Sequence, residues 1–332
     1  MKYESDKMQN VSILRVCSMM LIVLYHSLCF YIGVWWYLST VEEPIWKLIA
    51  FPVVKVGLTT FVFISGFLYG YMYIERGKYR KVKSFIINKS KRLLIPYFFW
   101  GIVMILMMPL LHIPWINLFT GIAHLWFLLM LFEIFVLMAL LNKLGIGVQK
   151  AKILDFVVVI ISFILLYVWK QYSSHQHFFG IDNTLYYLPA FFVGFYFAKY
   201  RQKTNGRIIA FSLFIIGITL LLVLSFWGYH ESNTLYRIPA ILVSVSAMIL
   251  LKDSSFPFCQ SKMFVNLDKN SMGIYIFNQI VVFVLLLTPD IKTFLSHHSF
   301  VGVFLIFIIS FIIPWILSNL LNKSKYTSFL IG

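Results

Sequence analysis

The chain has 332 residues, of which 61% are hydrophobic and only 12% are charged. An ordinary soluble domain carries about a quarter charged residues, so no aqueous fold could cover this much apolar surface, and the lipid bilayer is the expected solvent. The net charge of +16 would favour nucleic acid as a partner only if it formed a continuous basic face on a soluble domain. The sequence contains no such domain, and nucleic-acid binding is not expected.

Apolar stretches follow one another along the whole chain, most of them close to the roughly 20 residues that cross a bilayer core about 30 Å thick. The predicted spans lie at 12–36, 50–74, 94–111, 120–141, 153–169, 184–199, 207–228, 235–251, 270–288 and 299–321. About ten are expected, and the shortness of some stretches leaves eight to eleven open. The longest polar interval, 75–91, is too short for a soluble domain. Residues 1–332 are therefore expected to form one all-α, polytopic membrane domain with no attached soluble domain.

The Lys and Arg residues of the loops alternate between basic-rich and basic-poor sides, as the positive-inside rule describes. With the N-terminus in the cytoplasm, 22 of the 28 Lys and Arg residues fall on the cytoplasmic side. Four fall outside, namely Lys47, Lys170, Arg237 and Lys292. This division predicts an even number of spans, with the N-terminus and the C-terminus both cytoplasmic.

The first predicted span contains two ionisable residues, Arg15 and His26. Eleven residues at about 100° each return close to the same face of a helix, about 16 Å further along its axis. Arg15 then lies at the cytoplasmic edge and His26 near mid-depth. Charged groups at such depth cost roughly 2–3 kcal/mol or more, which favours a functional role. The structural alternatives are a hydrogen-bonded packing histidine and a snorkelling topology anchor.

Five motifs follow one another in chain order. Their characteristic residues are Arg15 and His26; Gly57, Phe61, Phe63, Ser65 and Gly66; Lys89, Lys91, Arg92, Pro96 and Tyr97; His124 and Trp126; and Ser271, Tyr275 and Asn278. Together these motifs resemble the acyltransferase-3 family of membrane O-acyltransferases. The chain departs from the family pattern at Asn278, where histidine is frequent, and at Lys89 and Lys91, where arginine is frequent.

The resemblance implies a membrane O-acyltransferase in a bacterial cytoplasmic (inner) membrane. Such an enzyme moves an acyl group, commonly acetyl from acetyl-CoA, to a hydroxyl of an envelope polysaccharide or a lipid-linked glycan, and it has no permanently bound cofactor. A neutral imidazole can take the proton of an attacking hydroxyl, so His26 is the expected general base. Arg15 is expected to complete the catalytic site at the edge where the donor waits.

The basic loop before the third span is expected to bind the phosphates of acyl-CoA, through Lys89, Lys91 and Arg92. Topology and contact with anionic lipid headgroups are the alternative role. Trp126, Tyr275 and Asn278 are expected to line the acceptor site, and for the two aromatic residues packing is an equal alternative.

Three further features leave alternatives open. Glu133, inside the fourth predicted span, has no partner that the sequence identifies. Ser65 and Gly66 are more typical of close helix packing than of chemistry. The loop histidines His175, His177, His297 and His298 have no fixed acid or third ligand, so no metal site is expected.

Two rival functions fit the composition. A transporter or flippase for a lipid-linked sugar would also need many spans and embedded ionisable groups, whereas a purely structural membrane protein would leave Arg15, His26 and Glu133 without a purpose. The ordered motifs and the basic loop favour the enzyme.

Overall fold

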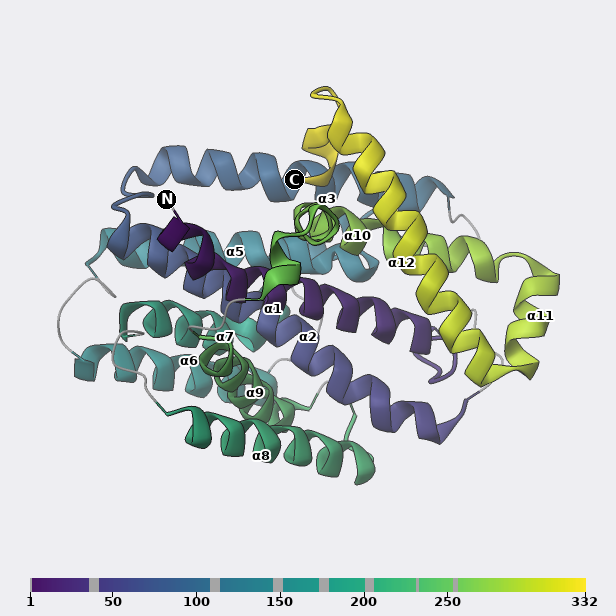
Figure 1. Ribbon diagram of the computed structural model, residues 1–332, viewed down its shortest axis with the longest axis horizontal. Coiled ribbons are helices and arrows are strands. Elements are labelled where there is room, and N and C mark those ends of the chain that lie inside the picture. Colours follow the sequence, from purple (N-terminus) through teal and green to yellow (C-terminus); the bar gives the residue numbers. More distant parts are fainter. Residues whose placement is uncertain are drawn as a thin grey trace. The chain divides into compact units, whose positions relative to one another are not determined.

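A computed structural model describes residues 2–35, 42–107, 114–145, 152–172, 179–200, 206–230, 233–252 and 256–332. Within these ranges every regular element is a helix and there is no β-strand, which confirms the predicted all-α fold (Figure 1). The long helices are α1 (Lys2–Leu28), α2 (Pro44–Gly70), α3 (Val82–Met107), α5 (Trp126–Lys143), α6 (Lys152–Tyr172), α7 (Ile181–Tyr200), α8 (Arg207–Phe226), α9 (Arg237–Leu250), α10 (Lys262–Leu286) and α12 (Ser299–Lys323).

Shorter elements connect the long helices. They are α4 (Asn117–Thr120), α11 (Pro289–His297), the π-turn η1 (Tyr71–Glu75) and the 3₁₀ turns η3 (Ala123–Leu125), η5 (Thr234–Tyr236), η6 (Pro257–Gln260) and η7 (Ser328–Ile331). The start of α10 has a clear local cause, because the Ser261 side chain accepts a hydrogen bond from the Phe264 amide at 3.2 Å. This N-cap lies nine residues before the predicted start at residue 270.

Each predicted span corresponds to one long helix, and the chain is a multi-pass membrane protein. Eight helical segments of the described ranges are long and apolar enough to cross a membrane, namely Gln9–Leu28, Pro44–Glu75, Val82–Met107, Asn117–Lys143, Lys152–Gln171, Arg207–Phe226, Lys262–Leu286 and Ser299–Lys323. Helix α7 is not among them, and α9 with its preceding turn forms a shorter apolar helix, Thr234–Leu250. That α7 and α9 also cross, giving ten spans, remains a prediction.

The helices pack as two compact units, each discontinuous in sequence. The first unit comprises Met1–Phe61 and Asn205–Thr327, and the second comprises Val62–Thr204 and Ser328–Gly332. Helix α2 contributes its first part to one unit and its second part to the other.

The first unit is built around α1, α10 and α12. Its core consists of Val16, Met19, Val23, Leu267 and Ile274, against which Phe61, Phe264, Phe307, Phe311 and Trp315 pack. Side-chain amides join α10 to α12, since Asn266 Nδ2 donates to Asn319 Oδ1 at 2.8 Å and Asn322 Nδ2 donates to Asn270 Oδ1 at 2.8 Å. Buried amides that satisfy one another are a common way to hold membrane helices together.

Helix α10 runs parallel to α1 and antiparallel to α12. The first relation follows because Arg15, midway along α1, pairs with Asp268 in the first third of α10. His26 then pairs with Asn278, and these two residues lie eleven and ten positions further along their helices. The second follows because α10 meets Ser318 of α12 at its first half and Ile309 at its end. These directions determine how far along the helix axes the side chains described below lie from one another.

The second unit is held by close backbone contacts and buried polar pairs. A Cβ atom on Gly66 of α2 would lie 2.1 Å from the carbonyl oxygen of Phe191 of α7, and one on Gly194 would lie 2.0 Å from that of Phe63. The two glycines therefore let α2 and α7 approach to backbone contact, which is the packing role that Ser65 and Gly66 suggested.

Glu133 of α5 has its partners in the second unit. Its Oε1 accepts a hydrogen bond from the Gly180 amide at 2.8 Å, and its Oε2 accepts one from the Thr184 hydroxyl at 2.5 Å. Because these groups lie at the start of α7, where backbone amides lack helical partners, Glu133 holds the N-terminus of α7 against α5. Nothing in this contact points to chemistry.

Candidate functional site

The His26 side chain lies near the end of α1 and is only 6% exposed. Its Nδ1 is hydrogen-bonded to Oδ1 of Asn278 on α10. The amide nitrogen of Asn278 donates to the backbone carbonyl of Tyr275 at 2.8 Å, so the amide oxygen is the atom that faces the ring. An amide oxygen can only accept, and a neutral imidazole that donates from Nδ1 carries its lone pair on Nε2. The arrangement therefore fixes both the orientation and the tautomer of His26.

Aromatic side chains surround this pair. The ring centroid of Trp35 lies 6.2 Å from that of His26 and 5.0 Å from that of Phe283, which it meets edge-on. Asn278 is fully buried, and Tyr275 is 4% exposed. The imidazole thus lies in an enclosed, largely apolar setting, in which a hydrogen bond acts more strongly than in water.

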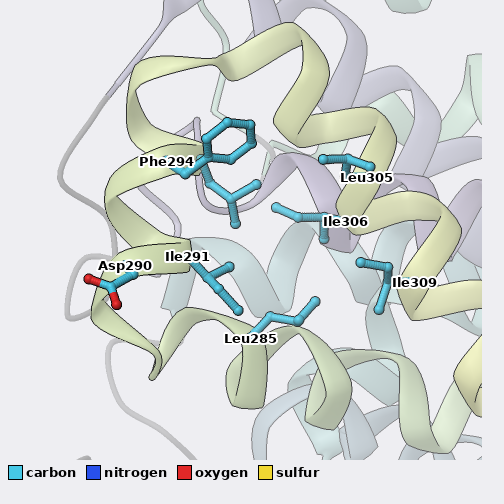
Figure 2. Close-up of a pocket in the computed structure, with 8 residues that line it drawn as sticks. Leu285, Asp290, Ile291, Phe294, Leu305, Ile306 and Ile309 are labelled. Atoms are coloured by element: carbon cyan, nitrogen blue, oxygen red, sulfur yellow. The ribbon is translucent and has the colours of Figure 1, made fainter.

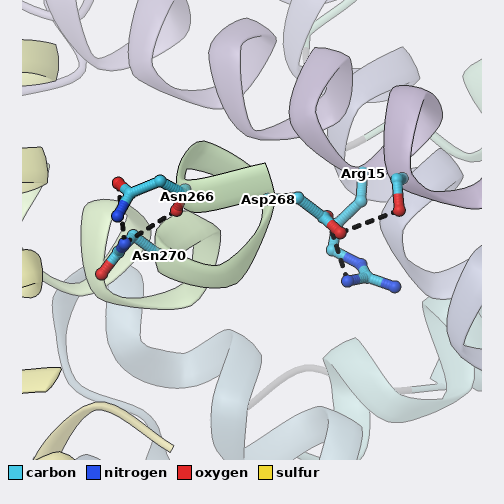
Figure 3. Close-up of polar contacts among 5 residues, drawn as sticks. Arg15, Asn266, Asp268 and Asn270 are labelled. Atoms are coloured by element: carbon cyan, nitrogen blue, oxygen red, sulfur yellow. Dashed lines mark hydrogen bonds and ion pairs between the residues drawn. The ribbon is translucent and has the colours of Figure 1, made fainter. Parts of the chain in front are cut away.

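Arg15 lies midway along the same helix and pairs with a residue that the sequence did not single out. Figure 3 shows its guanidinium beside Asp268 of α10, with 3.0 Å between Nη1 and Oδ1. The other carboxylate oxygen of Asp268 accepts a hydrogen bond from Ser12 at 2.8 Å. The α1–α10 interface thus carries two polar pairs, His26 with Asn278 and Arg15 with Asp268.

The three predicted donor ligands belong to the second unit, at the start of α3, and have different surroundings. The Lys89 ammonium lies 3.9 Å from the ring centroid of Phe135, in a cation–π contact, with the rings of Phe85 and Tyr79 also near it. Lys91 and Arg92 are exposed. A phosphate bound by Lys89 would compete with this cation–π contact.

Trp126 also belongs to the second unit, where it begins α5. Its ring centroid lies 5.8 Å from that of Tyr187 on α7. In the first unit the structure thus brings His26, Tyr275 and Asn278 together. Arg15 lies about three turns before His26 on the same helix. That Lys89, Lys91, Arg92 and Trp126 join them in one site remains a prediction.

Sequence reasoning missed several buried or half-buried charged residues, among them Asp268 and Arg237. Asp268 immediately precedes the predicted span at 270–288, and a lone acid at that edge was the available signal. Arg237 was counted among the basic residues on the extracytoplasmic side, and its side of the membrane remains a prediction. It is the first residue of α9, it is fully buried, and its Nη1 donates to the hydroxyl of Thr59 at 2.7 Å.

Figure 2 shows an apolar pocket of about 300 Å³ where α10, α11 and α12 meet. It is lined by Leu285, Asp290, Ile291, Phe294, Leu295, Leu305, Ile306 and Ile309. The Tyr31 hydroxyl, beyond the end of α1, donates to the Leu295 carbonyl at 3.1 Å. Burial and the nearby Glu43 carboxylate raise the pKa of this hydroxyl, so it keeps its proton and can donate. The pocket wall is therefore tied to the helix that carries His26.

No group of three or more His, Cys, Asp or Glu side chains that could hold a metal ion occurs within the described ranges. Two of the loop histidines considered above, His175 and His177, lie outside those ranges.

A comparison with protein families supplies the chemical class. The Acyl_transf_3 model, described as an acyltransferase domain, matches residues 8–319, a range that includes both polar pairs of the α1–α10 interface. No curated protein and no solved structure matches the chain. The family match covers nearly the whole chain and confirms the resemblance that the motifs indicated. The chain therefore belongs to the acyltransferase-3 family and is an acyltransferase that transfers groups other than amino-acyl groups.

Proposed function

We propose that this protein is an O-acyltransferase that moves an acyl group, acetyl in the simplest case, from acyl-CoA to a hydroxyl of a lipid-linked glycan or an envelope polysaccharide. The observation that supports this proposal is the buried imidazole of His26, held by Asn278, whose own amide is oriented by the Tyr275 carbonyl. A hydroxyl is a poor nucleophile near neutral pH, so a base fixed in the correct tautomer is what the reaction requires.

The proposed reaction has two proton transfers and one exchange of bonds. The acceptor hydroxyl gives its proton to Nε2 of His26 while its oxygen attacks the thioester carbonyl, and a C–O bond forms. The tetrahedral intermediate collapses, the C–S bond breaks, and the imidazolium returns the proton to the departing CoA sulfur. Asn278 accepts from Nδ1–H throughout, as the acid does in a catalytic triad, but it contributes no charge.

The donor is proposed to enter from the cytoplasm. Both termini are placed on that side, in a bacterial cytoplasmic membrane, because of the distribution of Lys and Arg. Arg15, Lys91 and Arg92 would contact the phosphates of CoA, and Lys89 would do so from its aromatic surroundings. The parallel course of α1 and α10 is compatible with this orientation, because it places the starts of both helices on one side of the membrane.

The acceptor is proposed to carry a lipid tail. In the proposed orientation, α11 and its pocket lie towards the opposite face of the membrane from Arg15. The pocket is lined almost wholly by apolar side chains and is tied to α1 through Tyr31. An apolar chain seated there would leave its polar headgroup near the end of the helix that carries His26. Trp126, Tyr275 and Asn278 remain the proposed lining of the acceptor site.

Transfer of labelled acetyl from acetyl-CoA to a lipid-linked glycan, in vesicles that contain purified protein, tests the proposal. Wild type should acylate the acceptor, and His26→Ala should lower the rate by roughly 10²- to 10⁴-fold per folded molecule, the usual contribution of a general base. A structural histidine would instead reduce the amount of folded protein and leave the rate per molecule near normal.

The same vesicles test the rival function, because movement of the lipid-linked sugar across the bilayer can be measured in parallel. A wild type that moves the sugar without acylating it is a transporter or flippase, and the enzyme proposal then fails.

A further inference from the structure

The contact between Arg15 and Asp268 joins α1 to α10 (Figure 3). It lies about three helical turns from the His26–Asn278 pair, which joins the same two helices. Asp268 uses both carboxylate oxygens, one for the Arg15 guanidinium at 3.0 Å and one for the Ser12 hydroxyl at 2.8 Å. Ser12 and Arg15 lie three residues apart, on one face of α1. The carboxylate is thus fixed from two sides, and Arg15 is fixed through it.

The geometry of the pair leaves most of the guanidinium available. Only Nη1 of Arg15 contacts the carboxylate, whereas an arginine side chain has five N–H donors in a planar fork. A bidentate contact would have used both arms of that fork. An arginine that uses one nitrogen for a carboxylate can use its other N–H groups to bind a second anion, such as a phosphate.

The Arg15–Asp268 pair is half-buried and lies beside an apolar core. The side chains of Arg15 and Asp268 are 27% and 18% exposed. The adjoining apolar core of Val16, Met19 and Leu267 also holds α1 against α10, so the contact between the helices does not depend on the ion pair alone. The pair therefore has a location, at the edge of a rigid interface, that suits ligand binding.

We infer that Asp268 is a positioning residue, which orients the Arg15 guanidinium towards the anionic part of the acyl donor. The inference rests on the proposed function, because it takes acyl-CoA as the donor. Acyl-CoA is a long molecule with phosphates at one end and its thioester at the other. Since Arg15 and His26 lie on one face of α1, about 16 Å apart along its axis, a donor held at Arg15 can extend towards His26.

Binding of CoA to the purified protein is the primary measurement, because it does not depend on transfer. Asp268→Asn should weaken binding about tenfold, as Arg15→Ala should, since both remove the same oriented cation. Ser12→Ala should weaken it less, about twofold to threefold, because Oδ2 of Asp268 loses its partner and Oδ1 keeps Arg15. The double variant Arg15→Ala with Asp268→Asn should bind CoA no more weakly than Arg15→Ala alone, because neither residue acts without the other.

Transfer kinetics supply the second measurement. Asp268→Asn should raise the KM for acyl-CoA and leave kcat within about threefold, provided that donor binding equilibrates before chemistry. The Asn side chain preserves the shape of Asp268, so its variant should insert and fold, and Asp268→Glu should recover part of the affinity by restoring the charge.

Three results would overturn the inference. Asp268→Asn could leave CoA affinity unchanged while lowering only the thermal stability, which would make the pair a brace between helices. It could bind CoA more tightly, which would show that Asp268 competes with the donor for Arg15. Wild type could fail to bind CoA at all. If wild type binds CoA with the expected dependence on Asp268 but transfers no acyl group, the inference stands and the proposed function fails.

Discussion

The amide of Asn278 decides which nitrogen of His26 bears the proton. Its oxygen accepts from Nδ1, and its nitrogen is taken by the Tyr275 carbonyl, so the amide cannot turn over without losing a buried hydrogen bond. The tyrosine carbonyl, the amide and the imidazole form a chain in which each group fixes the next. The sequence analysis assigned Asn278 to the acceptor site, and in the structure its side chain contacts the proposed base, His26.

Replacing Asn278 by leucine should therefore lower kcat while leaving the KM for acyl-CoA near its wild-type value. A loss of roughly 10- to 100-fold is expected, the range seen when a residue that orients a functional histidine is removed. Asn319→Leu is the matched control, because it removes another amide of the same unit, which is bonded to Asn266 and remote from His26. The control should lower thermal stability and leave the rate per folded molecule unchanged. Equal rates for the two variants would remove Asn278 from the catalytic arrangement.

Single residues also show how far the sequence can be interpreted. Arg15 and His26 were identified because ionisable groups are rare in apolar stretches, and their common helix face follows from spacing alone. Their partners, Asp268 and Asn278, are more than 250 residues away, and helix spacing says nothing about contacts between distant helices. The partners of Glu133 were missed for a related reason. One is a backbone amide, which leaves no mark in the sequence.

At the scale of whole helices, the sequence predicted the long apolar helices correctly, but it did not predict the short amphipathic helix α11. The stretches predicted at 270–288 and 299–321 correspond to α10 and α12. Between them α11 covers nine residues, too few for a span-length window, and alternates apolar Ile291 and Phe294 with charged Asp290 and Lys292. Yet α11 forms a wall of the pocket, so the missed element is one that the acceptor proposal uses.

The crossing of α2 and α7 predicts a sharp response to a single methyl group. Gly66→Ala and Gly194→Ala each place a Cβ about 2 Å from a carbonyl oxygen of the other helix, and backbone cannot yield as a side chain does. Overpacking of this kind typically costs about 1–3 kcal/mol, so thermal unfolding in detergent should show a clear loss of stability.

Gly180→Ala is the control for this crossing. Its added Cβ would make an ordinary contact, 3.6 Å from the Glu133 carboxylate, and its amide remains available to Glu133. It should unfold near the wild-type temperature. Wild-type stability of both Gly66→Ala and Gly194→Ala would mean that the two helices do not meet at these glycines.

At the scale of the whole molecule, the direction of α10 restricts the number of crossings. Helices α1 and α10 run parallel, so an even number of membrane crossings must separate the start of α1 from the start of α10. Both α7 and α9 therefore cross, giving ten spans, or neither does, giving eight. Because α12 runs antiparallel to α10, either count returns the C-terminus to the side of the N-terminus.

Cysteine accessibility distinguishes ten spans from eight, and we expect ten. In the eight-span arrangement, Lys199, Arg201, Lys203 and Arg207 would lie outside, against the positive-inside rule. In a background with Cys17, Cys29 and Cys259 replaced by alanine, Gly206→Cys should react with an impermeant thiol reagent only from the cytoplasm, and Trp227→Cys only from outside. Eight spans would exchange these two results. Lys292→Cys is the control, since it should react from outside under both counts, and its reaction from the cytoplasm would reverse the orientation on which the donor and acceptor proposals depend.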